Sequence, residues 1–219
     1  MLDTAQFIKV VAIWAIPVIF AITVHEVAHG YVAWKHGDPT AMLMGRLTLN
    51  PLKHIDPFGT ILLPGLLLLL GSPFLFGYAK PVPVNFAGLR NPKRDMVLVA
   101  LAGPVANLLM TFFWTLVLWT GAHLPGPLAY ISEPMQLMGV AGISINLILM
   151  ILNMIPIPPL DGGRVAVGLL PGPASDALSR LEPYGFIILI VLLFTGLLGT
   201  VMGPVFFLLR NLFLQMGGM

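Results

Sequence analysis

Four long apolar stretches limit most strongly how this chain can fold. They cover residues 10–34, 96–122, 135–155 and 184–209 of a 219-residue sequence. A helix that crosses a bilayer needs about 20 apolar residues, so each stretch is long enough for one crossing. Charged residues make up only 9% of the chain, and hydrophobic residues make up 58%. The sequence therefore predicts an all-α, polytopic membrane protein with four transmembrane helices, in which residues 1–219 form a single membrane-embedded domain.

The composition also excludes several classes of function. Lys and Arg number 11 against 9 Asp and Glu, and the bases are spread over several loops. Proteins that bind nucleic acid gather basic residues on one face, so the lipid bilayer is an expected partner and nucleic acid is not. The absence of cysteine excludes disulfides, thiolate ligands and Cys nucleophiles. The connections leave no room for an appended soluble domain, so we expect any regulatory protein to be separate.

Two segments between the first and second apolar stretches are less regular. Residues 58–76 are apolar but are interrupted by Pro64 and Pro73, which leaves a helix that is short for a crossing. We expect this segment to be re-entrant or interfacial. Residues 80–85 read Lys-Pro-Val-Pro-Val-Asn. Because proline has no N–H, only one side of this extended chain could form a continuous ladder, which predicts a short edge strand.

The first apolar stretch contains three ionisable residues within five positions. His25, Glu26 and His29 fit the pattern H-E-x-x-H. In this pattern the two His lie on one face of a helix and can share a metal ion, while the Glu stands beside them as a base. The alternative is that all three are hydrogen-bonded interior residues. Ionisable groups are costly within a bilayer, so a functional site is favoured.

A third metal ligand has to come from another part of the chain, because a catalytic zinc ion takes three protein ligands and keeps one position open. Without cysteine it must be His, Asp or Glu. Asp161 is the best candidate, since it closely follows the 135–155 stretch after a proline-rich turn. Its alternative role is the N-cap of a short helix that ends at Leu170. From there to Pro183 we expect a loop.

Three asparagines lie within predicted transmembrane helices: Asn107, Asn146 and Asn153. Asparagine commonly forms hydrogen bonds between helices in membranes, which is the favoured interpretation for Asn107 and Asn146. Asn153 lies eight residues before Asp161. That proximity favours a functional role for Asn153.

Two motifs and a segment between them follow one another along the chain: His25-Glu26-x-x-His29-Gly30, Gly103-Pro-x-x-Asn107, and Asn153-x-x-Pro156-x-Pro158-x-Leu160-Asp161-Gly162. Together they resemble the site-2 protease family of intramembrane zinc metalloproteases. The resemblance extends over most of the chain. Many relatives also carry a PDZ domain between the middle spans or a C-terminal pair of CBS domains. Here residues 122–134 replace the former and nothing follows the last span, so the chain resembles a minimal member.

The resemblance implies a role for each residue of the site. His25, His29 and Asp161 would hold one zinc ion per chain, and Glu26 would be the general base. Asn153 would bind the substrate carbonyl or its oxyanion. The implied substrates are membrane proteins that are cleaved in or near a transmembrane helix.

The topology can be predicted from the shared metal. Both metal motifs lie toward the C-terminal ends of their stretches, so the 10–34 and 135–155 helices must run in the same direction. The 96–122 helix is then antiparallel to both. Residues 35–95 carry seven Lys and Arg, and residues 122–134 carry none. By the positive-inside rule, we expect a cell-membrane protein whose active site opens toward the cytoplasm and whose termini both lie outside.

Peptide hydrolysis in the bilayer by a zinc-activated water is the predicted function, and two alternatives use the same residues. One is a metal-binding membrane transporter, against which stands the absence of internal repeats. The other is a proteolytically inactive membrane scaffold, which the intact set of motifs disfavours.

Overall fold

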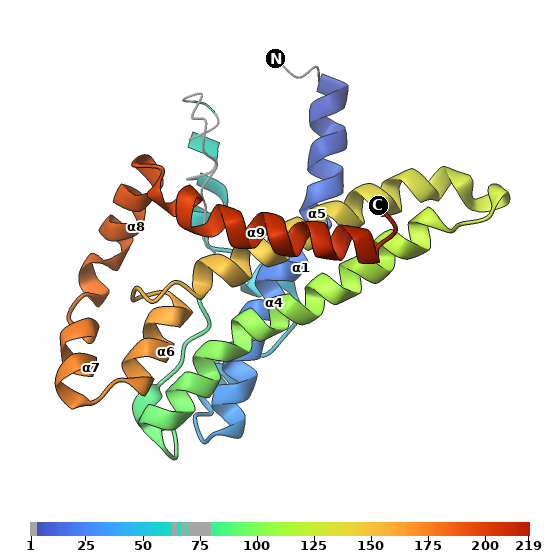
Figure 1. The fold of residues 1–219 in the computed structure, drawn as a ribbon. Helices are drawn as coiled ribbons and strands as arrows, with labels where there is room; N and C mark the ends of the chain where they lie inside the picture. Colours follow the sequence, from blue (N-terminus) through green and yellow to red (C-terminus); the bar gives the residue numbers. More distant parts are fainter. Residues whose placement is uncertain (1–3, 63–64, 67–68, 70–79) are drawn as a thin grey trace.

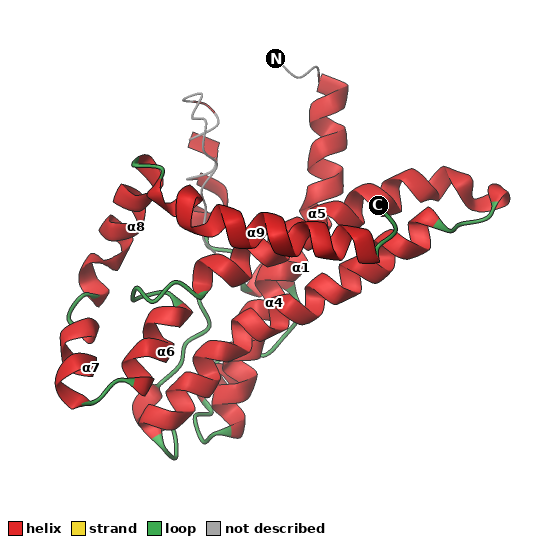
Figure 2. Ribbon diagram, in the orientation of Figure 1, coloured by secondary structure: helices red, strands yellow, loops and turns green. Residues whose placement is uncertain are grey.

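Three long helices form the framework of the molecule. The computed structural model describes residues 4–62, 65–66, 69 and 80–219, and all regular structure in these residues is helical (Figure 2). Helix α1 spans Thr4–Lys35, α4 spans Pro92–Ala122 and α5 spans Ala129–Asn153. Helices α4 and α5 form a long antiparallel hairpin that turns through η4 (Gly126–Leu128), and α1 packs across it (Figure 1). The prediction of an all-α polytopic membrane protein is confirmed.

Shorter elements lie on either side of the hairpin. Helix α1 is followed by α2 (Thr40–Leu43), η1 (Pro51–Lys53), a π-helical segment η2 (Pro57–Leu62) and η3 (Phe86–Gly88). The chain after α5 forms α6 (Asp161–Leu169), α7 (Gly172–Ser179), η5 (Glu182–Tyr184), α8 (Gly185–Phe194) and α9 (Leu197–Met216). Helix α9 returns across α5 and α4 (Figure 1).

The last predicted span is wrong. In the described part of the chain, five helical segments rather than four are long and apolar enough to cross a membrane: Ile8–Lys35, Pro92–Ala122, Gly126–Asn153, Gly172–Phe194 and Leu197–Met216. The stretch 184–209 is divided at Gly196, whose φ of 74° lies in the left-handed region that glycine adopts at little cost. The loop predicted up to Pro183 is also wrong, because it contains α7.

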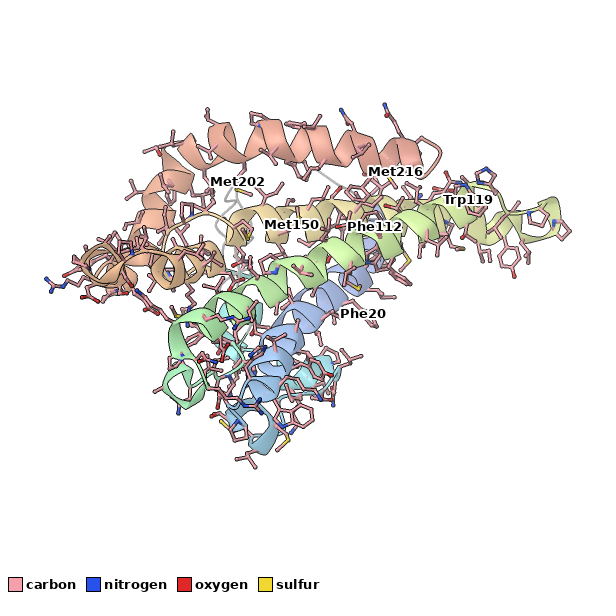
Figure 3. The ribbon with its side chains drawn as sticks, turned by 60° about the horizontal axis from the view of Figure 1, so that its bottom comes forward. Phe20, Phe112, Trp119, Met150, Met202 and Met216 are labelled. Atoms are coloured by element: carbon pink, nitrogen blue, oxygen red, sulfur yellow. The ribbon has the colours of Figure 1, made fainter. Side chains whose placement is uncertain are left out.

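The hydrophobic core lies where α4, α5 and α9 meet. Its buried members are large apolar side chains from the three helices: Trp114, Leu118, Ile143, Leu147 and Phe213. Near it, the ring of Phe112 packs edge-on against Phe213 with centroids 5.0 Å apart. Further along, Met150 on α5 and Met202 on α9 line an apolar cavity of about 380 Å³ (Figure 3). Helix α9 is therefore packed closely at one end and loosely at the other.

The end of α1 and the start of α4 lie side by side. The Arg90 N–H donates to the His36 carbonyl at 2.9 Å, and His36 Nδ1 lies 3.2 Å from Asp95 Oδ1. The Lys80 N–H donates to the His54 carbonyl at 3.0 Å, so the described flanks of the intervening stretch also meet. The re-entrant or interfacial segment expected over 58–76 lies mostly outside the described residues.

The edge strand predicted over 80–85 is wrong. This segment is extended, but no strand occurs in the described residues (Figure 2). Two of its N–H groups donate to side-chain carboxylates instead of a neighbouring strand. Val82 N–H donates to Glu26 Oε2 at 2.7 Å, and Asn85 N–H donates to Asp38 Oδ2 at 2.7 Å. Acidic side chains of α1 and of the residues after it therefore take the place of the expected ladder.

Candidate metal centre

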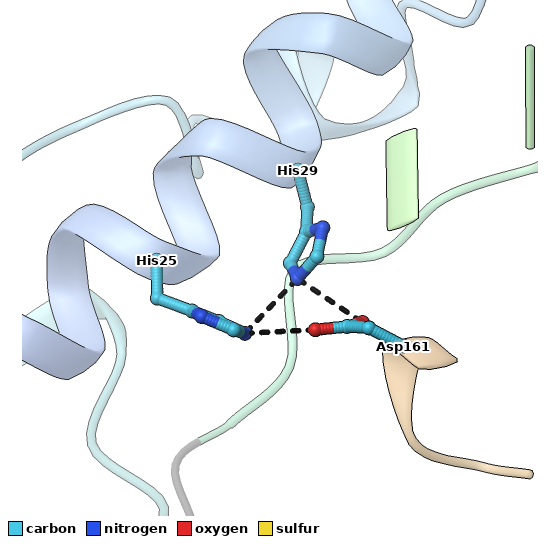
Figure 4. Close-up of side chains that lie close together, drawn as sticks. All are labelled: His25, His29 and Asp161. Carbon is cyan, nitrogen blue, oxygen red and sulfur yellow. Dashed lines mark hydrogen bonds and ion pairs between the residues drawn. The ribbon is translucent and has the colours of Figure 1, made fainter. Parts of the chain in front are cut away.

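The three predicted metal ligands lie together. His25 and His29 are one turn apart on α1, and Asp161 is the first residue of α6. The two Nε2 atoms are 3.0 Å apart, and each lies 3.3 Å from one oxygen of the Asp161 carboxylate (Figure 4). One ligand atom from each residue lies within 4.8 Å of the others, which is close enough to hold one metal ion.

The outer nitrogen of each imidazole is fixed by a carbonyl oxygen. His29 Nδ1 lies 2.7 Å from the Val99 carbonyl, and His25 Nδ1 lies 2.6 Å from Asn107 Oδ1. The amide of Asn107 is oriented because its Nδ2 donates to Asn146 Oδ1 at 2.9 Å. A carbonyl oxygen can only accept, so both Nδ1 atoms carry a proton, and in the neutral imidazoles both Nε2 atoms present a lone pair. The interhelical role interpreted for Asn107 and Asn146 is confirmed, and it also orients His25.

The inward atoms of the group require a positive charge between them. The side chains of His25 and Asp161 are buried, and Asp161 Oδ2 has no hydrogen-bond partner in the described part of the chain. Two lone pairs and a carboxylate that face one another repel unless a cation binds them. Two imidazole nitrogens and one carboxylate oxygen form a ligand set that zinc uses at catalytic sites. The residues present therefore fit a zinc ion.

Asp161 is directed into the centre by the turn that precedes α6. This turn follows α5, contains three of the named residues of the second motif, and includes the cis Pro158–Pro159 bond. The N-cap of α6 is Leu160, and no side chain caps this helix. The alternative role of Asp161 as an N-cap is therefore wrong, and its carboxylate faces the two imidazoles instead.

Gly103 lets α4 approach the imidazoles closely. A Cβ atom at this position would overlap the rings of both His25 and His29. The α4 backbone is thus a wall of the metal centre, and the same helix supplies Val99 and Asn107, which orient the rings. The geometry explains why the smallest residue stands at this position.

We expect Gly103→Ala to weaken zinc binding about 10- to 100-fold, the range typical of changes around a metal's ligands. The added methyl must displace one or both imidazoles. Zinc per chain in the purified protein, measured at fixed free zinc, checks this result. Gly199→Ala is the matched control, because nothing lies within 4 Å of the added Cβ there. Equal zinc affinity in both variants would contradict the close approach of α4.

Glu26 lies beside the metal group and is not part of it. The group identified among the described residues contains only the two His and Asp161. Glu26 Oε2 accepts the Val82 N–H, so this oxygen is directed toward the extended segment. Both residues line a cavity of about 370 Å³ that also contains the three ligand candidates. Within the described residues, the other carboxylate oxygen of Glu26, Oε1, has no hydrogen-bond partner.

Asn153 lies at the same cavity. It is the last residue of α5, and its Nδ2 donates to the Leu149 carbonyl one turn earlier at 3.0 Å. All five site residues predicted from the sequence therefore border one cavity. Arg164 also lines this cavity and was not predicted, whereas Val82 belongs to the side of the 80–85 segment that the prolines leave able to donate. The signal for Arg164 was its place three residues after Asp161, which is the same face of a helix.

Comparison with known proteins places the chain in a family of zinc metalloproteases. It is 44% identical over 191 residues to "Putative zinc metalloprotease YwhC" of Bacillus subtilis, covering 86% of this chain and 83% of that protein. It is 32% identical over 192 residues to "Putative zinc metalloprotease Rip2" of Mycolicibacterium smegmatis, covering 86% of this chain and 68% of that protein. No family model and no solved structure matches the chain. The chain belongs to the zinc metalloprotease family that these relatives represent.

Proposed function

We propose that the chain is an intramembrane zinc metalloendopeptidase of the site-2 protease type. In this proposal it hydrolyses a peptide bond in or near a transmembrane helix of a membrane-protein substrate. One observation carries the proposal. The His25, His29 and Asp161 group is walled by α1 and α4, and each of these helices is long and apolar enough to cross a membrane.

One zinc ion per chain is the proposed cofactor, held by the two His and Asp161. When bound, zinc supplies a Lewis acid that polarises a carbonyl and lowers the pKa of a water molecule. The chain's own contribution is the fixed direction of its ligands. The hydrogen bonds at both Nδ1 atoms keep the Nε2 lone pairs on the cavity side.

Glu26 is the proposed general base. Its Oε2 is held by the Val82 N–H, which leaves Oε1 to take a proton from the attacking water. The same carboxyl then delivers this proton to the leaving amine nitrogen. Asn153, at the wall of the same cavity, is proposed to hold the oxygen of the scissile carbonyl as negative charge develops on it.

A substrate helix has to unwind before these groups can reach a peptide bond, because its amides are hydrogen-bonded within the helix. The extended segment 81–84 lines the cavity and is the proposed place where the unwound chain lies. The Val82 N–H already binds Glu26, so a substrate that pairs with this donor must compete with the carboxylate.

The proposed topology places the active site toward the cytoplasm and both termini outside, in a cell membrane, which requires the segments Gly172–Phe194 and Leu197–Met216 to make one crossing between them. The lipid bilayer and a transmembrane substrate are the proposed partners, together with a separate regulatory protein. The seven Lys and Arg of residues 35–95 support this orientation. The hydrogen bond between Arg90 and His36 supports placing the end of α1 and the start of α4 on the same side of the membrane.

Single-cysteine variants test this topology without background, since the chain has no native cysteine. We expect Lys35→Cys and Arg90→Cys to react with an impermeant maleimide only from the cytoplasmic side. Gly126→Cys, in the turn between α4 and α5, should react only from outside. Labelling of Lys35 and Arg90 from opposite sides would contradict the proposed topology.

The function is tested by co-expressing the chain with a panel of single-span reporter proteins. We expect the wild-type chain to cleave at least one reporter within or beside its transmembrane segment. A transporter would bind zinc without any cleavage that depends on Glu26. A scaffold would do neither. Cleavage only in soluble portions of the reporters would contradict an intramembrane activity.

A further inference from the structure

Arg46 is a buried arginine that holds the backbone of the extended segment. It lies in the loop after α2 and is 6% exposed. Its Nη2 donates to the Lys80 carbonyl at 2.9 Å and to the Pro81 carbonyl at 3.4 Å. Its Nε is buried without a hydrogen-bond partner in the described part of the chain. Burying a guanidinium is costly, so this arginine needs a stronger reason than packing.

The Pro81–Val82 peptide connects Arg46 to Glu26. The carbonyl of Pro81 and the N–H of Val82 belong to the same trans peptide, whose C=O and N–H point in opposite directions. Arg46 binds the oxygen side, and Glu26 accepts from the N–H side at 2.7 Å. A donor that fixes the direction of the carbonyl therefore also fixes the direction in which the N–H points.

The surrounding sequence leaves few amide donors near this peptide. Pro81 and Pro83 have no N–H, so Val82 carries the single amide donor of these three residues. The ends of the segment are held separately, by the His54 carbonyl at Lys80 and by the Asp38 carboxylate at Asn85. Between those two attachments, Arg46 contacts the carbonyl side of the backbone and Glu26 accepts from the Val82 N–H.

We propose that Arg46 is a positioning residue for Glu26. It keeps the Pro81–Val82 peptide oriented so that the Val82 N–H holds one carboxylate oxygen and the other faces the cavity. The proposal rests on the proposed role of Glu26 as general base. It assigns to a buried arginine outside both metal motifs a function in the catalytic step rather than in metal binding.

Hydrogen exchange measures how well the Val82 N–H is protected by its hydrogen bond to Glu26, and it needs no substrate. Residues 81–84 contain only two amide hydrogens, on Val82 and Val84, because the other two residues are prolines. In Arg46→Gln we expect exchange in a fragment covering these residues to be roughly 10- to 100-fold faster, since a hydrogen bond from a charged donor is lost. Arg46→Lys should show an intermediate rate. Arg94→Gln, which removes an exposed arginine, is the matched control.

Activity and zinc content distinguish positioning from simple structural support. For a reporter that the wild-type chain cleaves, we expect Arg46→Gln to lower kcat roughly tenfold or more while KM changes less than about threefold. Zinc should stay at the wild-type level, and Arg46→Lys should restore part of kcat. A loss of zinc, or a change confined to KM, would overturn the assignment. Unchanged exchange in both Arg46 variants would also overturn the assignment, and this result does not depend on finding a cleaved reporter. If the wild-type chain cleaves no reporter, that result contradicts the proposed function and leaves the exchange test of Arg46 in force.

Discussion

Replacing Glu26 with Gln is expected to abolish peptide cleavage while one zinc ion per chain remains. The amide keeps the volume of the side chain and can still accept the Val82 N–H through its carbonyl oxygen. It cannot take a proton from water, and loss of a general base typically lowers the rate by about 10²- to 10⁴-fold. The metal should remain because its proposed ligands are other residues.

Reporter cleavage and elemental analysis of the same purified sample check this prediction. Glu133→Gln makes the same chemical change and is the control. Glu133 pairs with Lys9 at 2.7 Å, far from the cavity, and both side chains are mostly exposed. Cleavage at the wild-type rate in Glu26→Gln would remove this residue from the mechanism. Loss of zinc in that variant would instead make Glu26 a ligand.

Replacing Asp161 with Ala is expected to remove zinc and activity together. With three ligands there is no spare, so losing one leaves two imidazoles that bind zinc far more weakly. His25→Ala and His29→Ala should behave in the same way. The fold should persist in each variant, because the core of α4, α5 and α9 contains none of these residues.

Zinc titration at fixed protein concentration, followed by the reporter assay, measures both effects. Asp176→Ala on α7 is the matched control, since it removes an exposed carboxylate from a neighbouring helix. A full zinc content in Asp161→Ala would show that the third ligand lies elsewhere. Zinc loss with retained cleavage would mean that the activity does not need the metal.

The main helices could be predicted from the sequence because bilayer thickness sets their length. The predicted stretches 96–122 and 135–155 agree closely with α4 and α5. The break at Gly196 could not be predicted, because apolar residues continue on both sides and a single glycine is common in membrane helices. The structure shows a left-handed φ at Gly196 and contacts between α9 and α5, and neither is encoded in the local pattern.

The three residues that the structure brings together could be predicted from the sequence, but most of the contacts that orient their side chains could not. The spacing of His25 and His29 fixes their common face from local geometry alone. Gly103 and the Val99 carbonyl reach the imidazoles because α4 crosses α1 at this point. The spacing of residues along the sequence does not predict where two helices cross. The edge strand failed for a similar reason. The prolines correctly marked Val82 as the available donor, but its partner is a carboxylate on α1.

The hydrogen bond between His54 and Lys80 also affects how the chain can change over evolution. It joins His54 and Lys80, which are described residues on either side of a 25-residue stretch of sequence. The entropic cost of closing a loop grows slowly, by about 0.6 kcal/mol for each doubling of its length. Insertions or deletions within this stretch would leave the spacing of Arg46, Val82 and the metal group unchanged. The candidate metal group therefore depends on residues outside this stretch, and the length of the stretch can change without altering them.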